Sequence, residues 1–194
     1  MLRSDIKKAH ERACVESFID WHRNRYGSHY IVEAYPDPPD ALLCCKTKRS
    51  WVEVADVYWT SAWAKDQNTF VAENEIHEPI KDTIYEDMDK IFSGRFCEVL
   101  EKKIQNKEYM KVSSERGMGF LILNMMSPFF DDDTWRCMRL AWDAEDRPDN
   151  RIFQRVYCRF RSKNSFAFRR FPIEKISNAI NEMGEECGSP PSRG

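Results

Sequence analysis

The segment Pro36-Asp37-Pro38-Pro39-Asp40-Ala41-Leu42-Leu43 is followed, after the polar stretch 46–50, by Trp51-Val52-Glu53-Val54-Ala55. This pattern predicts two short strands joined by a tight turn, and each strand carries an acid among apolar residues. A carboxylate in the core of a sheet is costly unless a cation lies beside it. A divalent metal ion between Asp40 and Glu53 is one such cation.

The composition is typical of a globular protein with a full-sized core. The chain has 194 residues, of which 42% are hydrophobic and 32% are charged. We expect a single domain over residues 1–187, followed by a disordered tail at 188–194. Its N-terminal segment lacks the apolar core of a signal peptide and no apolar run reaches 18 residues, so we expect a cytoplasmic protein without membrane association. Seven cysteines without a Cys-x-x-Cys motif disfavour both a zinc site and a disulfide framework.

The periodicity of apolar residues predicts alternating helices and strands. Residues 60–78 give the weakest pattern, which we interpret as a loop followed by a short helical piece. The fold class is therefore α/β, with a central mixed β-sheet flanked by helices on both faces and with a C-terminal β-hairpin and helix. The predicted elements are a helix at 5–25, strands at 29–35, 40–45 and 51–59, a helix at 80–107, a strand at 119–126, a helix that follows residues 131–134 and ends at about Trp142, a hairpin of 152–160 with 165–171, and a helix at 172–183.

The relative position of the two acids depends on the strand register. A turn at 46–49 would place Cys45 opposite Ser50, which makes Asp40 and Glu53 diagonal neighbours on one face, roughly 7–8 Å apart between Cα atoms. A divalent ion can bridge that gap, whereas a one-residue slip would put the acids on opposite faces. The alternative is that Asp40 is a turn residue and that Glu53 pairs with an arginine.

A third acid lies on the apolar stripe of the first predicted helix. Helical spacing aligns Glu11 with Val15, Phe18 and His22. The simpler explanation is an acid placed in the N-terminal half of the helix by the helix dipole. The alternative is a role for Glu11 in a functional site.

These residues resemble the motif of the PD-(D/E)XK nuclease superfamily: a Pro-Asp pair, Asp40 opening an apolar strand, a tight turn, and Glu53 on the next strand. The order of elements over residues 5–126 also resembles the restriction-endonuclease-like core. The resemblance implies metal-dependent phosphodiester hydrolysis with Mg²⁺ or Mn²⁺. It implies that Asp40 and Glu53 are catalytic metal ligands and that Glu11 is a third ligand. Weaker candidates for ligands are Glu16 and Asp37.

The chain departs from the motif at Ala55, where the family usually has a lysine. Such a lysine positions the attacking water and neutralises developing charge. Lys65 is the expected substitute, with Gln67 as a further candidate, because both lie just beyond the predicted strand at 51–59. Ala55 keeps open the alternative of a nuclease fold without catalytic activity.

A basic segment follows the nuclease-like core. Residues 147–170 contain eight basic residues and one acid. Strand alternation would place arginines on one face with Phe153 and Tyr157, a combination that suits phosphate contact and base stacking. The alternative is a solvated face on which arginines cover aromatic rings. The predicted nucleic-acid-binding residues are Arg151, Arg155, Arg159, Arg161 and Lys163.

The leading hypothesis is therefore a Mg²⁺- or Mn²⁺-dependent nuclease acting on nucleic acid, with DNA as the expected polymer. The second is a catalytically inactive nuclease-fold module that binds nucleic acid or a protein partner. A third is a structural or assembly protein whose arginine-rich hairpin binds acidic protein surfaces. A homodimer is compatible with each of them.

Overall fold

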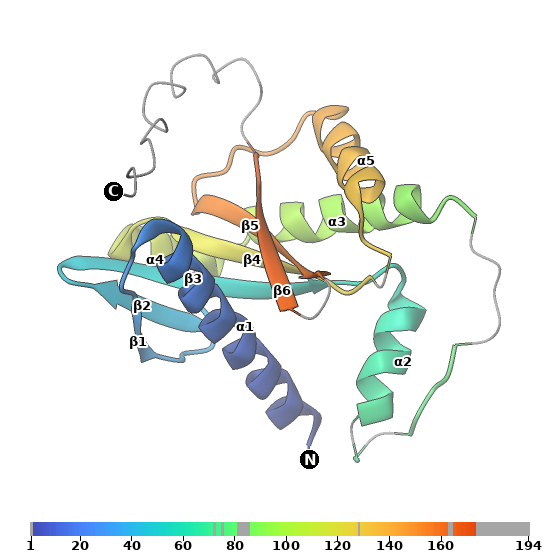
Figure 1. Cartoon of the computed structure of the whole chain (residues 1–194), viewed down its shortest axis with the longest axis horizontal. Helices are drawn as coiled ribbons and strands as arrows, with labels where there is room; N and C mark the ends of the chain where they lie inside the picture. Colours follow the sequence, from blue (N-terminus) through green and yellow to red (C-terminus); the bar gives the residue numbers. More distant parts are fainter. Residues whose placement is uncertain are drawn as a thin grey trace, which may run out of the picture.

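Six strands form one mixed sheet in the order β1-β2-β3-β4-β5-β6 (Figure 1). The computed structural model of the chain describes residues 2–71, 73–74, 76–80, 86–127, 129–162 and 165–173. Strands β1 to β3 are antiparallel, β3 to β5 are parallel, and β6 returns antiparallel to β5. The elements are α1 (Arg3–Tyr26), β1 (Ile31–Ala34), β2 (Ala41–Cys45), β3 (Lys48–Val57), α2 (Ser61–Val71), α3 (Met88–Ile104), α4 (Lys107–Arg116), β4 (Gly119–Met125), α5 (Asp132–Asp143), β5 (Phe153–Ser162) and β6 (Ser165–Phe171).

The predicted α/β class, with helices flanking a mixed sheet, is confirmed, and so is the hairpin that β5 and β6 form. The helix expected at 172–183 and the tail at 188–194 fall outside the described residues, apart from the first two residues of that helix. None of the helices in the described ranges is both long and apolar enough to cross a bilayer.

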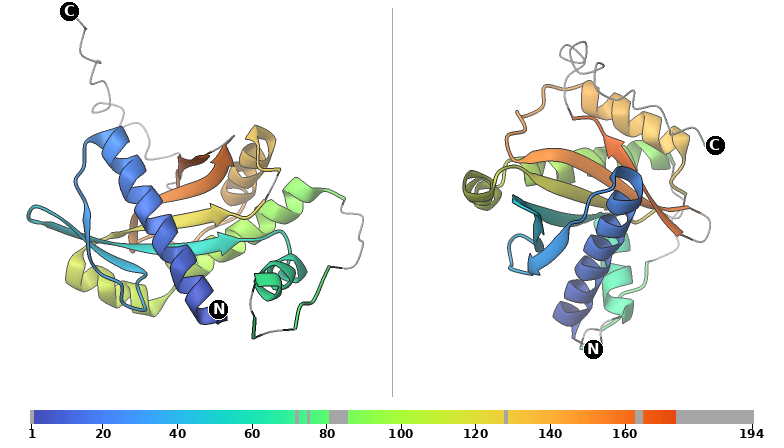
Figure 2. Two further views of the ribbon diagram at one scale, coloured as in Figure 1. Left: turned by 60° about the horizontal axis from the view of Figure 1, so that its bottom comes forward. Right: turned by 60° about the vertical axis from the view of Figure 1, so that its left-hand side comes forward.

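Helix α1 covers one face of the sheet (Figures 1 and 2). Its apolar stripe includes Val15 and Phe18, which are fully buried against Val54, Phe120 and other side chains of the central strands. The helix ends at Gly27, whose φ of 66° lies in the left-handed region that a glycine adopts without steric cost. The stripe predicted from helical spacing is therefore the stripe that packs on the sheet.

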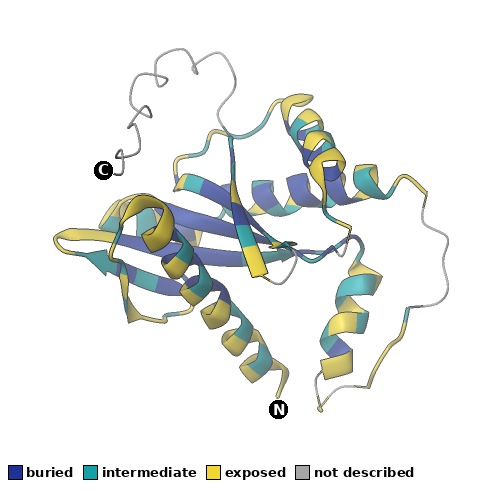
Figure 3. Ribbon diagram, viewed as in Figure 1, coloured by how far each residue is buried: buried dark blue, intermediate teal, exposed yellow. Residues whose placement is uncertain are grey.

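Helices α3, α4 and α5 contribute to the core on the opposite face. Phe92, Phe96 and Leu100 of α3 are fully buried there, next to Trp51 of β3. All seven residues of β4 are buried because helices cover both of its faces. Figure 3 shows this burial concentrated in the central strands, whereas α2 exposes most of its surface.

Three helices differ from the sequence prediction. Helix α2 begins at Ser61, soon after β3 ends, where a loop before a short helical piece was expected. The helical pattern at 80–107 corresponds to α3, which begins only at Met88, and residues 81–85 fall outside the described part. A separate helix, α4, was not predicted because its only buried residue is Tyr109, which gives no apolar periodicity. Its start is encoded locally, since the Asn106 side chain accepts a hydrogen bond from the Glu108 N–H.

Candidate carboxylate site

The turn between β2 and β3 is shorter than predicted. Cys45 pairs with Lys48, so the connection has two residues, and the first of them, Lys46, has a φ of 55°. The expected pairing of Cys45 with Ser50 is therefore wrong by two residues. An even shift keeps every side chain on its face, because the pleat has a period of two. Continuing the observed register by one residue places Asp40 directly opposite Glu53 rather than diagonal to it.

Glu53 is the most deeply buried acid of this site. Its Oε1 lies 2.7 Å from Lys103 Nζ, on α3, and accepts a hydrogen bond of 2.6 Å from the Tyr109 hydroxyl, on α4. Its Oε2 is buried and has no hydrogen-bond partner among the described residues. Half of this carboxylate is thus satisfied by a cation and a phenol, and the other half lacks the partner that a buried oxygen normally has.

Asp40 occupies the start of β2, where its Oδ2 accepts a hydrogen bond of 2.7 Å from the Val54 N–H. Burial, together with repulsion from Glu53 and Glu11, raises the pKa of Asp40 to about 7, although the hydrogen bond from Val54 and the charge of Lys103 act in the opposite direction. A carboxyl group with these surroundings holds its proton near neutral pH unless a cation lowers its pKa. A further cation bound beside Asp40 and Glu53 would therefore favour release of the Asp40 proton.

Helix α1 brings the third predicted acid to the same place. Glu11 is largely buried and lies 3.2 Å from Lys7, one turn earlier on the helix. Asp40 contributes to the raised pKa of Lys7, which locates Lys7 close to the carboxylates. The structure thus brings Glu11, Asp40 and Glu53 to one region. By contrast, Glu16 and Asp37 are exposed.

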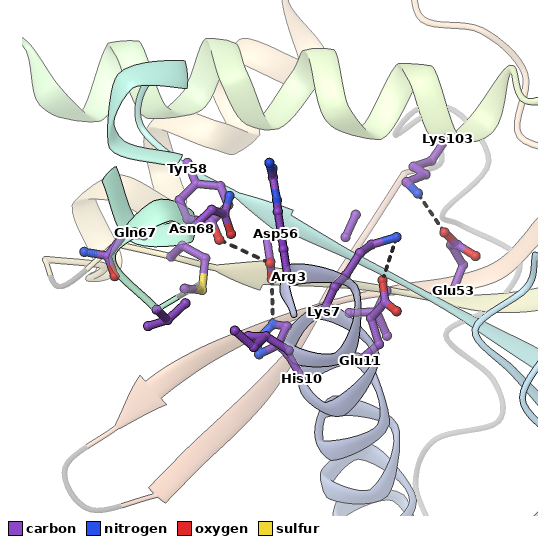
Figure 4. A pocket seen from close by; sticks show the side chains of 15 residues that line it. Arg3, Lys7, His10, Glu11, Glu53, Asp56, Tyr58, Gln67, Asn68 and Lys103 are labelled. Carbon is purple, nitrogen blue, oxygen red and sulfur yellow. Dashed lines mark hydrogen bonds and ion pairs between the residues drawn. The ribbon is translucent and has the colours of Figure 1, made fainter. Parts of the chain in front are cut away.

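A cavity of about 530 Å³ opens beside these acids, between α1, α2 and the sheet (Figure 4). Glu11, Glu53 and Lys103 line one part of it. Figure 4 shows Lys103 and Glu53 at one end of the view, with Gln67 and Asn68 of α2 at the other. The volume lies in the usual range of small-molecule pockets.

A second polar network lies on the α1 side of the sheet. His10 Nε2 is 2.9 Å from Asp56 Oδ1, to which Asn124 also donates at 2.9 Å. The hydrogen bond to Asp56 raises the pKa of His10 to about 10, so the ring is cationic at neutral pH. Asp56 points to the face opposite Glu53, and this network is separate from the carboxylate pair.

Lys65 does not reach the carboxylate site. Its Nζ lies 2.6 Å from Glu78, and it lines a smaller cavity with Ile76. The cation that contacts Glu53 is Lys103 instead, in the last turn of α3. Ala55 and Gln67 do line the main cavity. The reason is geometric, because α2 carries Lys65 away from the sheet edge while the last turn of α3 passes directly over Glu53.

The arginines of β5 do not form the continuous basic face that alternation predicted. A register shift between Gly119 and Phe120 changes the alternation at the start of β5, so Phe153 packs in the core on the α3 side. Arg159 is buried, with 5% of its surface exposed; it donates to Asn124 Oδ1 at 2.8 Å and lies over the ring of Phe166. Arg159 therefore supports the core and is not available to a polyanion.

The other predicted basic residues are scattered. Arg151 is exposed and lies 3.5 Å from Asp149, while Arg155 is half-buried with its guanidinium over the Tyr26 ring. Arg161 is exposed, and Lys163 falls outside the described residues. Only Arg151 and Arg161 of the described set present a largely exposed side chain.

Lys103 and Tyr109 were missed by the sequence analysis. Lys103 lies seven residues after Phe96 and three after Leu100, so it is a cation on the buried stripe of its helix. The same signal had identified Glu11 on α1 and could have identified Lys103. Tyr109 gave no signal, because its role depends on how α4 folds back onto β3.

Within the described ranges, no group of three or more His, Cys, Asp or Glu residues is arranged to hold a metal ion. Comparisons of the chain with family models, with curated proteins and with solved structures give no match. The function must therefore be inferred from the geometry of the site itself.

Proposed function

We propose that this protein is a divalent-metal-dependent nuclease of PD-(D/E)XK type, with Asp40 and Glu53 as metal ligands. The observation that carries the proposal is the unpartnered, buried Oε2 of Glu53 beside an Asp40 carboxyl whose pKa is raised to about 7. Both features are expected where a cation normally completes the charge balance.

The donor set fits Mg²⁺ or Mn²⁺. Mg²⁺ is commonly held by one or two carboxylates, with water and substrate phosphate completing its coordination. A pair of carboxylates with Glu11 nearby meets that requirement, although three acids are not preassembled around one point. When bound, the metal ion would polarise the phosphate and lower the pKa of a water molecule.

Lys103 takes the role that the resemblance assigns to a lysine at position 55. Its Nζ lies 2.7 Å from Glu53 Oε1 and 3.1 Å from the Tyr109 hydroxyl, which fix its position. A cation held beside the carboxylates can stabilise negative charge that develops on a phosphate oxygen. The absence of a lysine at position 55 is thus compatible with catalysis, because α3 supplies the cation from another element.

Titration calorimetry with Mg²⁺ and Mn²⁺ tests the metal site. We expect binding to the parent protein, and at least a tenfold weaker affinity in Asp40→Asn and Glu53→Gln. Glu16→Gln is the matched control, because Glu16 is an exposed carboxylate on α1. The parent and Glu16→Gln should cleave labelled single-stranded, duplex or flapped oligonucleotides, and Asp40→Asn and Glu53→Gln should cleave them much more slowly. Metal binding and cleavage that are both absent from the parent would overturn the proposal.

A catalytically inactive module is the second candidate. It is favoured by the ion pair in which Lys103 already occupies Glu53 Oε1. In that case Lys103 replaces the metal ion, and the protein binds nucleic acid or a protein partner without hydrolysis. The calorimetry separates the candidates, because an inactive module of this kind binds no divalent ion at Asp40 and Glu53.

A further inference from the structure

The cavity extends well beyond the carboxylates. Besides its charged groups, its lining includes the apolar side chains of Ile6, Val71 and Met126. Gln67 and Asn68 of α2 line a second part of it, away from Glu53 and Lys103 (Figure 4). A metal ion and a phosphate do not need amides and apolar side chains, so the second part calls for a different group.

We propose that this second part binds the base and sugar of one unpaired nucleotide, next to a phosphate held at the charged end. The inference rests on the proposed function only for the position of the cleaved phosphate. It adds the substrate class: single strands, strand ends and flaps, rather than the interior of a duplex.

The lining side chains provide the contacts that a nucleobase requires. Carboxamides such as those of Gln67 and Asn68 both donate and accept hydrogen bonds, as the edges of bases do. The Tyr58 ring also lines the cavity, and its hydroxyl donates to Asp56 Oδ2 at 3.3 Å, which restricts the ring's orientation. An aromatic ring of fixed orientation is a platform on which any base can stack.

The charged wall suits the sugar-phosphate part of the same nucleotide. Arg3, Lys7 and His10 follow one another at helical spacing along the cavity face of α1, and Lys103 faces them from α3. Lys7 and His10 are already paired with Glu11 and Asp56, so they form an orienting wall of mixed charge rather than a purely basic patch. A phosphate at this wall binds most tightly when a metal ion offsets the negative charge of the acids.

The size of the cavity disfavours a paired base. Its volume of about 530 Å³, between α1, α2, α3 and the sheet, is large enough for a nucleotide but not for a stacked base pair. A base inside a duplex is stacked on both faces and paired along its edge, so it must leave the stack to enter such a cavity. Unpaired nucleotides enter without this cost, which is why we infer a preference for single-stranded substrates.

Calorimetry with thymidine 5′-monophosphate and with inorganic phosphate tests the inference without any cleavage step. Each ligand is titrated into the full chain, with Mg²⁺ and with EDTA. We expect the nucleotide to bind at least tenfold more tightly than phosphate in the Mg²⁺ buffer. Asn68→Ala, which removes an amide, and Ile6→Trp, which fills the apolar part, should each remove most of that difference.

Ile91→Trp is the matched control, because Ile91 is a partly exposed isoleucine on α3 that does not line the cavity. It should bind the nucleotide as the parent does. A single-stranded oligonucleotide should compete with the nucleotide at least tenfold better than a blunt duplex of the same sequence. Equal affinity for nucleotide and phosphate, or a nucleotide affinity that neither cavity variant changes, would overturn the inference.

The result is independent of the nuclease proposal. A preference for the nucleotide over phosphate that Asn68→Ala abolishes supports the base site even if no oligonucleotide is cleaved. Conversely, metal-dependent cleavage with no preference for the nucleotide over phosphate supports the nuclease and refutes the base site.

Discussion

Replacing Lys103 by methionine removes the only side-chain cation hydrogen-bonded to Glu53 within the described residues, while it keeps a similar chain length. The Glu53 side chain is 7% exposed and that of Lys103 is 22% exposed, so the pair is largely buried. Removing one partner of a fully buried ion pair costs about 3–5 kcal/mol. Because Lys103 retains some contact with solvent, we expect Lys103→Met to lower the free energy of unfolding by about 2–3 kcal/mol.

The same variant should respond more strongly to a divalent ion than the parent does. Loss of the ammonium group leaves both oxygens of Glu53 available beside Asp40, so Mg²⁺ can take the place of the lost charge. With a dissociation constant of about 1 mM, 10 mM Mg²⁺ adds about 1.4 kcal/mol to the stability of the native state. Mg²⁺ should therefore restore roughly half of the lost free energy of unfolding. The rate of cleavage should still fall by about 10²-fold or more, because the cation at the phosphate is missing.

Urea denaturation at pH 8, in EDTA and in 10 mM Mg²⁺, measures both effects. Lys102→Met is the matched control, because Lys102 is the exposed neighbour on the same helix, and it should change stability by less than about 0.5 kcal/mol. A Lys103→Met variant as stable as the parent in EDTA would refute the buried ion pair. A stability loss that Mg²⁺ leaves untouched would refute the convergence of the carboxylates on a metal site.

Four further substitutions test other features of the structure. Asp40 has a pKa raised to about 7, so it keeps its proton in the folded protein at pH values where the unfolded chain has lost it. The parent therefore loses stability as the pH rises from about 4 to 7. In EDTA, the free energy of unfolding of Asp40→Asn relative to that of the parent should rise by roughly 2–3 kcal/mol between pH 5 and pH 8, as measured by urea denaturation. A difference between the two proteins that stays constant with pH would contradict the raised pKa. Arg159→Met should lower the free energy of unfolding by about 1–2 kcal/mol, because the buried amide of Asn124 loses its donor. Oligonucleotide affinity, measured by fluorescence anisotropy, should not change. A fall in affinity without a fall in stability would show that the Arg159 side chain reaches the ligand. Gly119→Ala would place a Cβ 2.4 Å from the buried Trp51 ring and should lower the melting temperature by the equivalent of about 2–3 kcal/mol. Gly94→Ala, in the open middle of α3, should raise stability by about 0.5–1 kcal/mol, and equal effects of the two glycine substitutions would contradict the packing around β4.

Local patterns in the sequence were sufficient for most of the fold. The stripe of Val15 and Phe18 predicted α1 and its buried face, and the continuous apolar run at 119–126 predicted the central strand β4. Both succeed because burial of apolar side chains sets the period of a helix or strand directly. The separate helix α4 was missed because it buries one residue, Tyr109, which leaves no period to detect.

From the sequence by itself, strand alternation placed Asp40 and Glu53 on one face of the sheet, whereas Glu11 joined them only through the family resemblance. That result survived a wrong turn length because the error in register was even. What surrounds these acids was decided by tertiary structure. Lys103 reaches Glu53 across 50 residues of chain, and Arg159 is buried beneath α1 instead of facing solvent. Contacts of this kind depend on how elements pack against one another, and no local period in the sequence records the angle at which two elements cross.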